Sequence, residues 1–584
     1  MRQFQFEYNS KLSFTREIVK LDKWCKTHIC TSVVFNIFSE TPDKGVLMDI
    51  STVIETIMPY ALFMGCSSNG NIVDGALSEN PIAITCTVFE YPTTRLKMLQ
   101  YDFRADTQKT VAESLKNEIK EMGGVKAVEM LLTIRGMSLS VFCDSLADLP
   151  EDIQIYGGGA FNTDINSNVA CVFTNKKGLS ATSIAFLLIA GEDFHITTNY
   201  VTGWKPLGRD LLVTKAKGSL LCELDGKPAY ETYYRYLNIN NDEDFFYNTL
   251  EFPFLYRHNE IDILRAPTAS LPDGSLVMTS DIEENVTARI AYGDPWTILD
   301  CVHEECHEIQ KFRPEIIHIY SCAARRTFWG NHEASNETLP FHRIAPVSGF
   351  YTSGEFLRTK GFLNQHNVTL VIGAMREGEM PDDLPRSEEY YKTGMSGKIS
   401  MVSRLATFIG AATAELEEAN RRLEVIAVSD GLTKLFNRGE IQRRIESILD
   451  RGKMPFTLIM LDIDNFKRIN DTYGHKEGDN VIVGLSSLLK DGAKTLEPRG
   501  SAGRWGGEEF MLLLPNKSIE EAKEIADRIR TKFAAIKFDR AENVTVSAGV
   551  TAAVPSEKPD VLYNRVDGAL YEAKQTGKNK TVIK

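Results

Sequence analysis

The chain has 584 residues, of which 43% are hydrophobic and 25% are charged, and its formal net charge is -13. Since a single hydrophobic core stops growing at roughly 250–300 residues, this length predicts about three domains. The negative net charge argues against a general electrostatic grip on nucleic acid or on an anionic membrane, whereas binding a nucleotide needs only a few local cations.

No apolar run in the sequence approaches the ~20 residues that a membrane-spanning helix needs. Residues 184–190 form the best short run, which Gly191 and Glu192 interrupt, so we expect a buried strand there. The first residues, Met1-Arg2-Gln3-Phe4, are not followed by the continuous apolar stretch of a signal peptide. We therefore expect a cytoplasmic protein of a bacterial cell.

Residues 20–365 have the texture of an α/β region. Short β-branched runs at 32–38 and 369–372 predict strands, and the glycine-rich stretches 65–70 and 157–159 predict turns. A loop rich in proline, glycine and acidic residues is expected at 376–386.

The ten cysteines all precede residue 323 and are scattered, as is typical of reduced core thiols rather than of a disulfide framework. Cys66 has no histidine near it in sequence, which favours a buried thiol over a nucleophile. His303 and His307 stand at i and i+4 beside Cys301 and Cys306, a spacing that metal ligands use. No second pair completes such a site, so we favour an amphipathic helix whose cysteines face a core.

The clearest periodic signal lies between residues 401 and 426. Apolar residues recur there alternately four and three apart, and charged residues lie between them. The seam consists of Met401, Leu405, Ile409, Ala412, Leu416, Ala419, Leu423 and Ile426. Such a narrow stripe favours a parallel dimeric coiled coil over the alternative, a single helix lying on its own domain. Its alanines would suit a signalling stalk that changes register or angle.

From residue 429 to the end, strand-like and helical patterns alternate again. We predict strands at 456–463 and 544–554, a hairpin over about 501–515, and helices at 439–450, near 478–490, at 519–535 and near 559–576. This alternation predicts a sheet with helices packed on its faces.

Carboxylates stand at the ends of two of these predicted strands. Asp462 closes an apolar strand, where a carboxylate is costly to bury unless it is paired or bound to a cation. Gly506 and Gly507 are a hairpin turn signal, and Glu508 and Glu509 follow directly. If the two strands are neighbours, Asp462 and Glu508 converge, and converging hard oxygen ligands predict a Mg²⁺ site that would bind phosphates.

The same region offers partners for a nucleotide. Lys467, Lys574 and Lys578 are cations placed to meet phosphates, and Gly506 and Gly507 allow backbone to approach them. An amide and a carboxylate, those of Asn470 and Asp479, are able to form paired hydrogen bonds with a base edge. Each signal alone has an ordinary structural explanation, so the joint set carries the prediction.

Taken together, these motifs resemble the GGDEF family over nearly all of 429–584. The blocks that carry the resemblance are Ser429-Asp430-Gly431-Leu432-Thr433, Asp462-Ile463-Asp464-Asn465-Phe466-Lys467, Gly506-Gly507-Glu508-Glu509-Phe510, Val546-Ser547-Ala548-Gly549-Val550 and Ala569-Leu570-Tyr571-Glu572-Ala573-Lys574. The resemblance implies a polymerase-palm-like domain that condenses two GTP into cyclic di-GMP and two pyrophosphates with Mg²⁺, or with Mn²⁺ in its place. It also implies that two such domains face each other as a homodimer, each holding one GTP.

The resemblance also implies roles for individual residues. Asp462 and Glu508 would hold the metal with their side chains and Ile463 with its carbonyl, and Glu509 would assist in activating the 3′-hydroxyl. Guanine would be read by Asn470 and Asp479. Phosphates would be held by Lys467, Lys574, Lys578, Gly506, Gly507 and the backbone near Phe466.

Two positions depart from the family pattern. Lys434 stands where the family usually has glycine, away from the metal ligands, so we expect little effect. The family's Arg-x-x-Asp product-inhibition motif has Glu497 and Gly500 in its slots, and Arg499 is out of register. We therefore expect no high-affinity product feedback there.

The region before the stalk resembles a FIST sensory domain, in its N and C parts. The resemblance is carried by residues 64–70, 157–160, 322–326 and 348–355. It implies an intracellular sensor of an unknown small molecule, without naming ligand residues or saying whether the ligand activates or inhibits. Within it, we favour a solvated pair over an anion contact for Arg325 and Arg326.

The resulting fold class is α/β (α+β), with an N-terminal α/β sensory region, a helical coiled-coil linker and a C-terminal polymerase-palm-like domain. We place the boundaries at 20–222 and 223–365 for the two FIST parts, 397–428 for the helix and 429–584 for the GGDEF domain. The favoured function is a FIST-regulated diguanylate cyclase without nucleic-acid or membrane partners. The alternatives are a catalytically inactive receptor of GTP or cyclic di-GMP and a promiscuous cyclic dinucleotide synthase.

Overall fold

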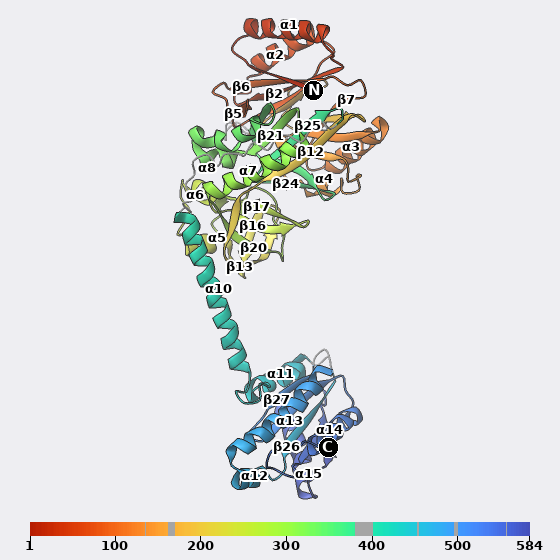
Figure 1. Ribbon diagram of the computed structural model, residues 1–584, viewed down its shortest axis with the longest axis vertical. Coiled ribbons are helices and arrows are strands. Elements are labelled where there is room, and N and C mark those ends of the chain that lie inside the picture. Colours follow the sequence, from red (N-terminus) through yellow and green to blue (C-terminus); the bar gives the residue numbers. More distant parts are fainter. Residues whose placement is uncertain (135, 162–169, 380–400, 452–454, 496–499, 556) are drawn as a thin grey trace. The chain divides into compact units, whose positions relative to one another are not determined.

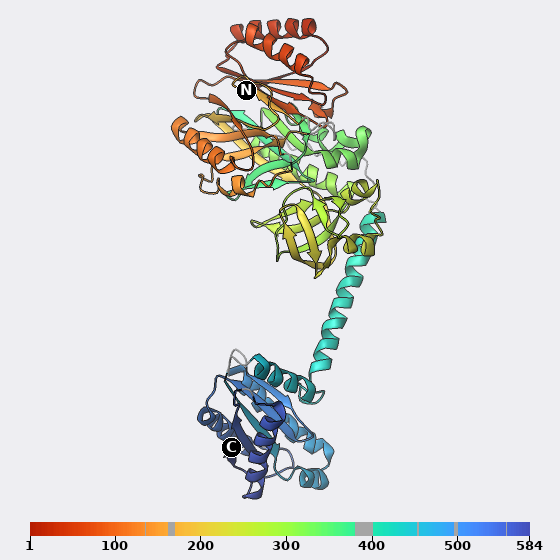
Figure 2. The ribbon, with the colours of Figure 1, turned by 180° about the vertical axis from the view of Figure 1, so that it is seen from behind.

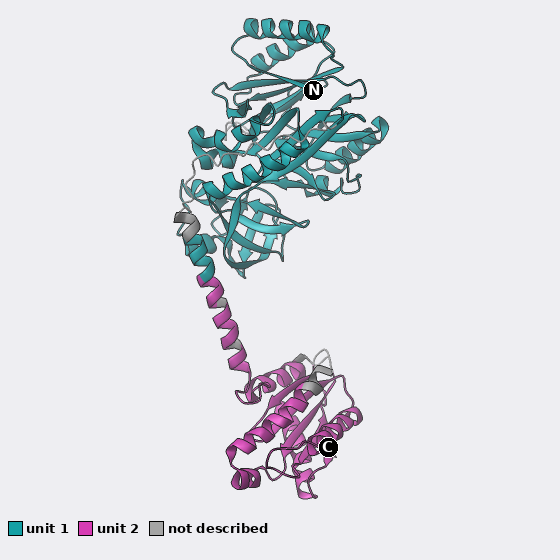
Figure 3. Cartoon of the chain, viewed as in Figure 1, with its two compact units in different colours: residues 1–411 teal, residues 412–584 magenta. Residues whose placement is uncertain are grey.

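The computed structural model describes residues 1–584 except 135, 162–169, 380–400, 452–454, 496–499 and 556. The chain divides into two compact units, Met1–Ala411 and Ala412–Lys584 (Figure 3). Both units mix helices and sheets, which confirms the mixed α/β fold class. Within the described residues, no helix is long and apolar enough to cross a bilayer.

The first sheet of unit 1 carries the N-terminal strand at its edge. Its strand order is β1 (Arg2–Glu7), β6 (Ile82–Phe89), β2 (Ser32–Ser39), β3 (Leu62–Ser67) and β10 (Val172–Thr174). Helices α1 (Lys11–Thr27) and α2 (Lys44–Ile57) cover one of its faces (Figures 1 and 2). The predicted strand at 32–38 is thus confirmed as β2.

The second sheet contains the strand that the apolar run at 184–190 predicts. Its order is β24 (Phe362–His366), β23 (Glu355–Thr359), β9 (Gln154–Gly159), β8 (Val125–Leu132), β11 (Ser183–Ala190) and β7 (Arg95–Asp102). Helices α3 (Gln108–Met122) and α4 (Ser140–Asp144) pack against it. All eight residues of β11 are buried, as predicted for the apolar run at 184–190.

The third sheet combines strands from both ends of unit 1. Its order is β12 (Phe194–Val201), β25 (Leu370–Glu377), β21 (Ile316–Cys322), β22 (Val347–Thr352), β4 (Asn71–Val73) and β5 (Ala76–Leu77). The helices beside it are α7 (Pro295–Phe312), α8 (Ala323–Glu333), the 3-10 helix η1 (Ala334–Glu337) and α9 (Leu339–His342). The predicted strand at 369–372 is the first part of β25.

The fourth sheet is built from the middle of the chain. Its order is β17 (Ile261–Arg265), β16 (Phe254–His258), β20 (Thr287–Gly293), β13 (Trp204–Lys217), β14 (Leu220–Leu224), β19 (Leu276–Met278) and β18 (Pro267–Ser270), with β15 (Lys227–Pro228) paired to β14. Helices α5 (Ala229–Leu237) and α6 (Phe245–Leu250) complete its separate core.

Of the two glycine-rich segments predicted as turns, 157–159 lies in β9, so that prediction was wrong, whereas 65–70 begins in β3 and ends in the bend before β4, so the prediction is confirmed only for its second half. Gly65 is in β3, where an added Cβ would lie 2.3 Å from the carbonyl oxygen of Ile37. Gly157 is in β9 with φ +153°, and a Cβ there would lie 1.9 Å from the carbonyl oxygen of Met130. These glycines permit close strand packing, which in sequence looks the same as a turn signal.

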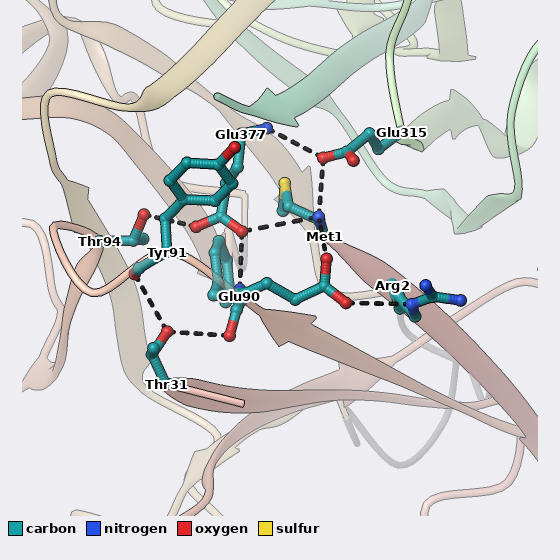
Figure 4. A network of polar contacts seen from close by, with 9 residues as sticks. Met1, Arg2, Thr31, Glu90, Tyr91, Thr94, Glu315 and Glu377 are labelled. Atoms are coloured by element: carbon teal, nitrogen blue, oxygen red, sulfur yellow. Dashed lines mark hydrogen bonds and ion pairs between the residues drawn. The ribbon is translucent and has the colours of Figure 1, made fainter. Parts of the chain in front are cut away.

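Partly buried ionic contacts join the first and third sheets. The terminal amine of Met1 lies 2.7 Å from Glu315 Oε2, 3.3 Å from Glu90 Oε2 and 3.6 Å from Glu377 Oε2 (Figure 4). Thr94 donates a hydrogen bond of 2.5 Å to Glu377 Oε1. Because Glu90 follows β6 while Glu377 ends β25, this network ties strands of separate sheets together.

Helix α10 (Met401–Val428) covers most of the predicted stalk, and residues 397–400 lie outside the described part of the chain. In unit 2, the strand order is β27 (Ser501–Arg504), β28 (Glu509–Pro515), β26 (Phe456–Ile463), β29 (Val546–Ala552) and β30 (Thr581–Ile583). The accompanying helices are α11 (Arg438–Arg451), α12 (Phe466–Tyr473), α13 (His475–Thr495), α14 (Ile519–Ala534) and α15 (Pro559–Gln575).

The alternation of side chains along β26 separates two cores in unit 2. Ile459, Leu461 and Ile463 pack with α13 and α14 in one core. Leu458 and Met460 pack with α11 and α15 in the other. The predicted strands and helices of this unit are confirmed within a few residues, and the structure adds α12 and β30. Because side chains alternate, Asp462 continues the row of Leu458 and Met460 toward α15.

Candidate active site at the end of the central strand

The candidate site begins where the central strand β26 ends. Asp462 is 4% exposed and stands directly opposite Glu509 of β28 on one side and Ser547 of β29 on the other. Since opposite residues of antiparallel strands project to the same face, Asp462 and Glu509 share a face of the sheet. This confirms the prediction that the strand ending at Asp462 and the strand after the Gly506-Gly507 turn are neighbours.

The hairpin between β27 and β28 closes through the four residues 505–508. Arg504 donates from Nη2 to the carbonyl oxygen of Gly507 at 2.7 Å and from Nε to that of Gly506 at 3.2 Å. Its Nη1 lies 3.2 Å from Asp430 Oδ1, so one guanidinium ties the loop to the segment after α10. Glu508 lies in this loop, and its carbonyl oxygen accepts a hydrogen bond of 3.4 Å from the amide of Ile463.

The electrostatics of this strand end are unbalanced. Lys574 Nζ lies 2.5 Å from Asp462 Oδ2. Burial raises the pKa of Asp462 to about 6; Lys574 opposes this shift, and the charges of Glu508 and Glu509 add to it. Three carboxylates thus share one lysine, which leaves an excess of negative charge where a cation would fit.

The described part of the chain does not gather three acidic, histidine or cysteine side chains closely enough to enclose a metal by themselves. Two carboxylates with a carbonyl, completed by water or phosphate oxygens, form the kind of open oxygen site that Mg²⁺ uses. Asp462, Glu508 and the carbonyl of Ile463, a residue that is 1% exposed, are the candidates for such a donor set.

A second buried carboxylate, Asp464, holds the end of α15 to the sheet. Asp464 Oδ1 accepts from the Ser547 hydroxyl at 2.6 Å, and Oδ2 accepts from the Thr545 hydroxyl at 2.7 Å and from the amide of Asn579 at 3.0 Å. Lys578 Nζ lies 2.5 Å from Asn465 Oδ1. The loop that carries Lys578 is therefore fixed beside the start of α12.

The predicted base-reading residues lie on α12 and at the start of α13. A Cβ added to Gly478 would lie 1.9 Å from Asn470 Oδ1, so the glycine makes room for this amide. That oxygen is buried and accepts no hydrogen bond from any described residue. Asp479 is exposed one residue beyond Gly478. An unpaired buried acceptor is costly, and a ligand donor would satisfy it.

The first turn of α12 carries two more predicted residues. Asn465, with φ +57°, precedes the helix in a left-handed conformation. Phe466 is buried in the core, whereas the side chain of Lys467 is exposed. The exposed amine and the amides of the helix start are available to an anion.

The structure thus places the predicted residues along one end of the sheet, but it brings Asp462, Lys574, Glu508 and Glu509 into the tightest group. Sequence reasoning assigned no function to Asp464 and Arg504. For Asp464 the signal was a second acid two residues after Asp462, on the same side of the chain. For Arg504 it was a basic residue immediately before the hairpin. Glu497, in one of the two product-inhibition slots, and the out-of-register Arg499 lie outside the described residues, whereas Gly500 is described.

Candidate residues in unit 1 have structural surroundings. Cys66 is fully buried, and burial raises the pKa of its thiol well above the ordinary value, which agrees with the predicted buried thiol. All ten cysteines lie in described residues and are free thiols. Cys306 faces the core from α7, whereas His307 is exposed.

The predicted solvated pair Arg325 and Arg326 was wrong. Arg325 is fully buried and pairs with Glu337 at 2.6 Å, and Arg326, with 19% of its side chain exposed, pairs with Glu40 at 3.2 Å. The acidic partners, Glu337 and Glu40, are not sequence neighbours of Arg325 and Arg326, so no local sequence pattern reveals either ion pair.

Three family models match the chain. Residues 34–227 match the FIST N domain, residues 229–358 match the FIST C domain, and residues 427–580 match the model described as diguanylate cyclase, GGDEF domain. The chain therefore carries these three domains in that order.

Relatives of known name match its C-terminal part. Diguanylate cyclase DgcM of Escherichia coli (strain K12) is 37% identical over 179 residues, which is 29% of this chain and 41% of DgcM. Response regulator PleD of Caulobacter vibrioides (strain NA1000 / CB15N) is 36% identical over 168 residues, 27% of this chain and 36% of PleD. The chain thus spans less than half of the length of these two relatives.

Among solved structures, one match is the crystal structure of the coiled coil and GGDEF domain of DgcB from Caulobacter crescentus in complex with c-di-GMP. It is 30% identical, covers 32% of this chain and 100% of that chain, and has a TM-score of 0.29.

Proposed function

We propose that this chain, with its FIST N, FIST C and GGDEF domains, is a diguanylate cyclase that condenses two GTP into cyclic di-GMP and two pyrophosphates under the control of its FIST region. The observation that carries the proposal is the group of three carboxylates, Asp462, Glu508 and Glu509, at one strand end with a single lysine beside them. DgcM and PleD resemble the chain over this part.

We assign the metal site to Asp462 and Glu508 through their side chains and to Ile463 through its carbonyl. Mg²⁺ is the expected ion, with Mn²⁺ as a substitute, because the donors are hard oxygens and the local charge is negative. When bound, such an ion neutralises developing phosphate charge and lowers the pKa of a coordinated hydroxyl. Glu509, opposite Asp462, is placed to accept the proton of the attacking 3′-hydroxyl.

We assign the phosphates to cations and amides around the same strand end. The end of α15 and the loop after it provide Lys574 and Lys578. The first turn of α12 provides Lys467 and the backbone of Phe466. The hairpin provides Gly506 and Gly507. The anchoring of Asn579 by Asp464 supports this, because it holds the loop of Lys578 in one place before substrate arrives.

We assign guanine recognition to Asn470 and Asp479. Guanine presents N–H donors at its N1 and N2 positions, which an amide oxygen and a carboxylate accept. The buried, unpartnered Oδ1 of Asn470 supports this assignment, since adenine has no donor at N1 with which to satisfy it.

Catalysis on two GTP molecules requires two domains to face each other, and we propose that α10 pairs with the α10 of a second copy. Its apolar seam is exposed within one chain: 54% at Leu405, 62% at Leu416, 62% at Leu423 and 69% at Ile426. A parallel coiled coil would bury that seam. Tethering would raise the local concentration of the second domain to the order of millimolar.

We keep the domain limits 20–222, 223–365, 397–428 and 429–584 as part of the proposal, together with a cytoplasmic location. The ten free thiols support a reducing compartment. Because Glu497 and Gly500 stand in place of the Arg-x-x-Asp motif, we still expect only weak inhibition by the product at that site.

The test is to incubate the purified full-length chain with GTP and Mg²⁺, with Mn²⁺, and with EDTA, and to identify the products by mass spectrometry. We expect cyclic di-GMP and pyrophosphate with either ion, none with EDTA, and a specific activity that rises with protein concentration as dimers form. ATP in place of GTP should give no product. GTP binding without any cyclic dinucleotide would instead establish an inactive receptor, and mixed products would establish a promiscuous synthase.

A further inference from the structure

A cavity of about 370 Å³ lies within unit 1, between elements that are far apart in the sequence. Its walls come from α4 with the turn before it, from β16 and β17, from residues 280–283 and from β24. Helix α4 belongs to the part that matches the FIST N model, whereas β16 and β17 belong to the part that matches FIST C. A ligand of small-molecule size would therefore contact both parts at once.

The chemically unusual group in the cavity wall is Arg265, which is only 5% exposed. Its Nε donates to the carbonyl oxygen of Asp281 at 2.9 Å, and its Nη1 donates to the carbonyl oxygen of Leu264 at 2.9 Å and to Asn367 Oδ1 at 3.2 Å. These acceptors are neutral. Among the described residues no carboxylate lies within ion-pair distance of Arg265, so only the more distant Asp281 and Glu283 of the cavity wall balance this nearly buried positive charge, which is costly.

The surroundings of Arg265 do not supply that counter-charge. His366, behind the cavity, is fully buried, and neither of its ring nitrogens has a hydrogen-bond partner in the described structure. Burial, followed by the charges of Arg265 and His258, lowers the pKa of His366 to about 3, so the imidazole is neutral. The Asn364 and Gln365 side chains in the wall are neutral amides.

The acidic residues of the cavity are engaged elsewhere or lie on its exposed side. Asp281 accepts a hydrogen bond from the Ser138 hydroxyl, Glu283 pairs with His258 Nδ1 at 2.6 Å, and Asp144 is exposed on α4. None of them lies within ion-pair distance of Arg265, but their charges weaken the binding of any anion, and that of a doubly charged anion about twice as much. A singly charged anion therefore fits this cavity better than phosphate or a dicarboxylate.

We propose that this cavity binds a small organic monocarboxylate, whose carboxylate group neutralises Arg265 while its remaining atoms lie against Leu363, Tyr256 and Cys143. Because Nε and Nη1 of Arg265 already donate within the chain, the carboxylate would accept from Nη2 in a charge-assisted hydrogen bond. Binding there is independent of the enzymatic activity. Only the consequence, that the ligand couples the FIST N and FIST C parts to control catalysis, rests on the proposed function.

The test measures thermal unfolding of the full-length chain with the sodium salts of acetate, butyrate, pyruvate and benzoate, and with the neutral amides acetamide, butyramide and benzamide as matched controls. We expect at least one monocarboxylate at 20 mM to raise the unfolding midpoint of unit 1 by two degrees or more, and its amide to have no effect, because only the anion neutralises Arg265. Phosphate and succinate should shift it less.

Three variants sharpen the result. Arg265→Lys keeps the charge but loses the planar fork, and we expect at least tenfold weaker binding; Arg265→Met should abolish it. Asp281→Asn retains an acceptor for Ser138 and removes one repelling charge, so succinate should bind more tightly than to the wild type. If Arg265→Met does not fold, Arg265→Lys and Asp281→Asn still decide the matter.

The proposal is overturned if no monocarboxylate stabilises the protein, if amides stabilise it equally, or if binding is unchanged in Arg265→Lys. The product assay with GTP is read separately. Monocarboxylate binding without cyclic di-GMP would remove the proposed function and leave the cavity site standing, and product formation without monocarboxylate binding would do the reverse.

Discussion

Both units bury charged side chains, and they compensate them in different ways. In unit 1, Arg325 and Glu337 are both fully buried, and their ion pair is completed by the Trp329 indole, which donates to Glu337 at 2.9 Å, and by the carbonyl oxygen of Thr202, which accepts from Arg325 at 2.7 Å. In unit 2, Asp462 is nearly as buried, but its one lysine faces two further carboxylates.

This comparison distinguishes a buried charge that is balanced within the chain from one that is not. A closed set such as Arg325 and Glu337 has its hydrogen bonds and its charge balanced within the chain, so removing one member leaves an isolated buried charge. An open set such as that of Asp462 has more acidic than basic members, and carboxylates with perturbed pKa values of this kind are typical of functional sites.

The largest expected effect is on turnover in the open set. We expect Glu508→Gln to lower the rate of cyclic di-GMP formation on the order of 10³-fold, about 4 kcal/mol of transition-state stabilisation, because a metal ligand is lost. The thermal unfolding midpoint should be unchanged or slightly higher, since a like charge is removed. The measurement pairs a product assay with a thermal scan.

The matched control for that substitution is Glu524→Gln, at an exposed position of α14 outside the site. It should leave turnover unchanged. Equal activity in Glu508→Gln and Glu524→Gln would contradict the metal-ligand assignment.

The closed set should respond in stability. We expect Arg325→Met to lower the free energy of unfolding of unit 1 by about 3–4 kcal/mol, because Glu337 is left buried and unpaired. Urea unfolding followed by tryptophan fluorescence measures this, since Trp204 and Trp329 both contact the pair. Arg326→Met, at a partly exposed ion pair, is the control and should cost about 1 kcal/mol or less. The double variant Arg325→Met/Glu337→Leu should recover much of the loss; no recovery would contradict charge balance as the cause.

Stability of the open set should depend on pH in metal-free protein. Since burial raises the pKa of Asp462 from 3.8 to about 6, the folded chain holds this proton more tightly than the unfolded chain. The contribution of Asp462 to stability is therefore full below about pH 4 and is lost as pH rises through 6. At pH 8 in EDTA we expect Asp462→Asn to be more stable than the wild type by on the order of 1–2 kcal/mol.

At pH 5 this difference should shrink, and Mg²⁺ should stabilise the wild type at pH 8 but not the variant. Thermal scans of both proteins at the two pH values measure these effects. If the stability difference between Asp462→Asn and the wild type grew at pH 5, the predicted direction of the pH dependence would be wrong.

The smallest expected effect concerns backbone strain elsewhere in unit 2. Lys434, which stands where the family pattern has glycine, has φ +58°, a left-handed conformation that disfavours a residue with a Cβ. We expect Lys434→Gly to stabilise unit 2 by about 0.5–1 kcal/mol without changing turnover. Urea unfolding measures it, with Lys517→Gly at a partly exposed position as the contrasting substitution. Destabilisation by Lys434→Gly would show that the lysine side chain makes a compensating contact.

The sequence predicted most of unit 2 because its signals are local. Strand β26, the hairpin before Glu509 and helices α14 and α15 follow from hydrophobic periodicity and turn residues, and the carboxylates stand at recognisable strand ends. Helix α12 was missed because it is short and begins after the left-handed Asn465, which gives no periodic signal. In unit 1 the glycines of β3 and β9 were read as turns because close strand packing and turns use the same residue.

By itself, the sequence determined the mixed α/β fold class, the apolar seam of α10 and the identity of the acids, amides and lysines at the candidate site, because each of these depends on residues near one another in the chain. Only the tertiary structure decided that Asp462 pairs with Lys574, that Asp464 anchors Asn579, and that Arg325 pairs with Glu337 while Arg265 forms no ion pair within the described residues. Charge compensation depends on distances between side chains and on exclusion of water, and those exist only after distant segments have packed together.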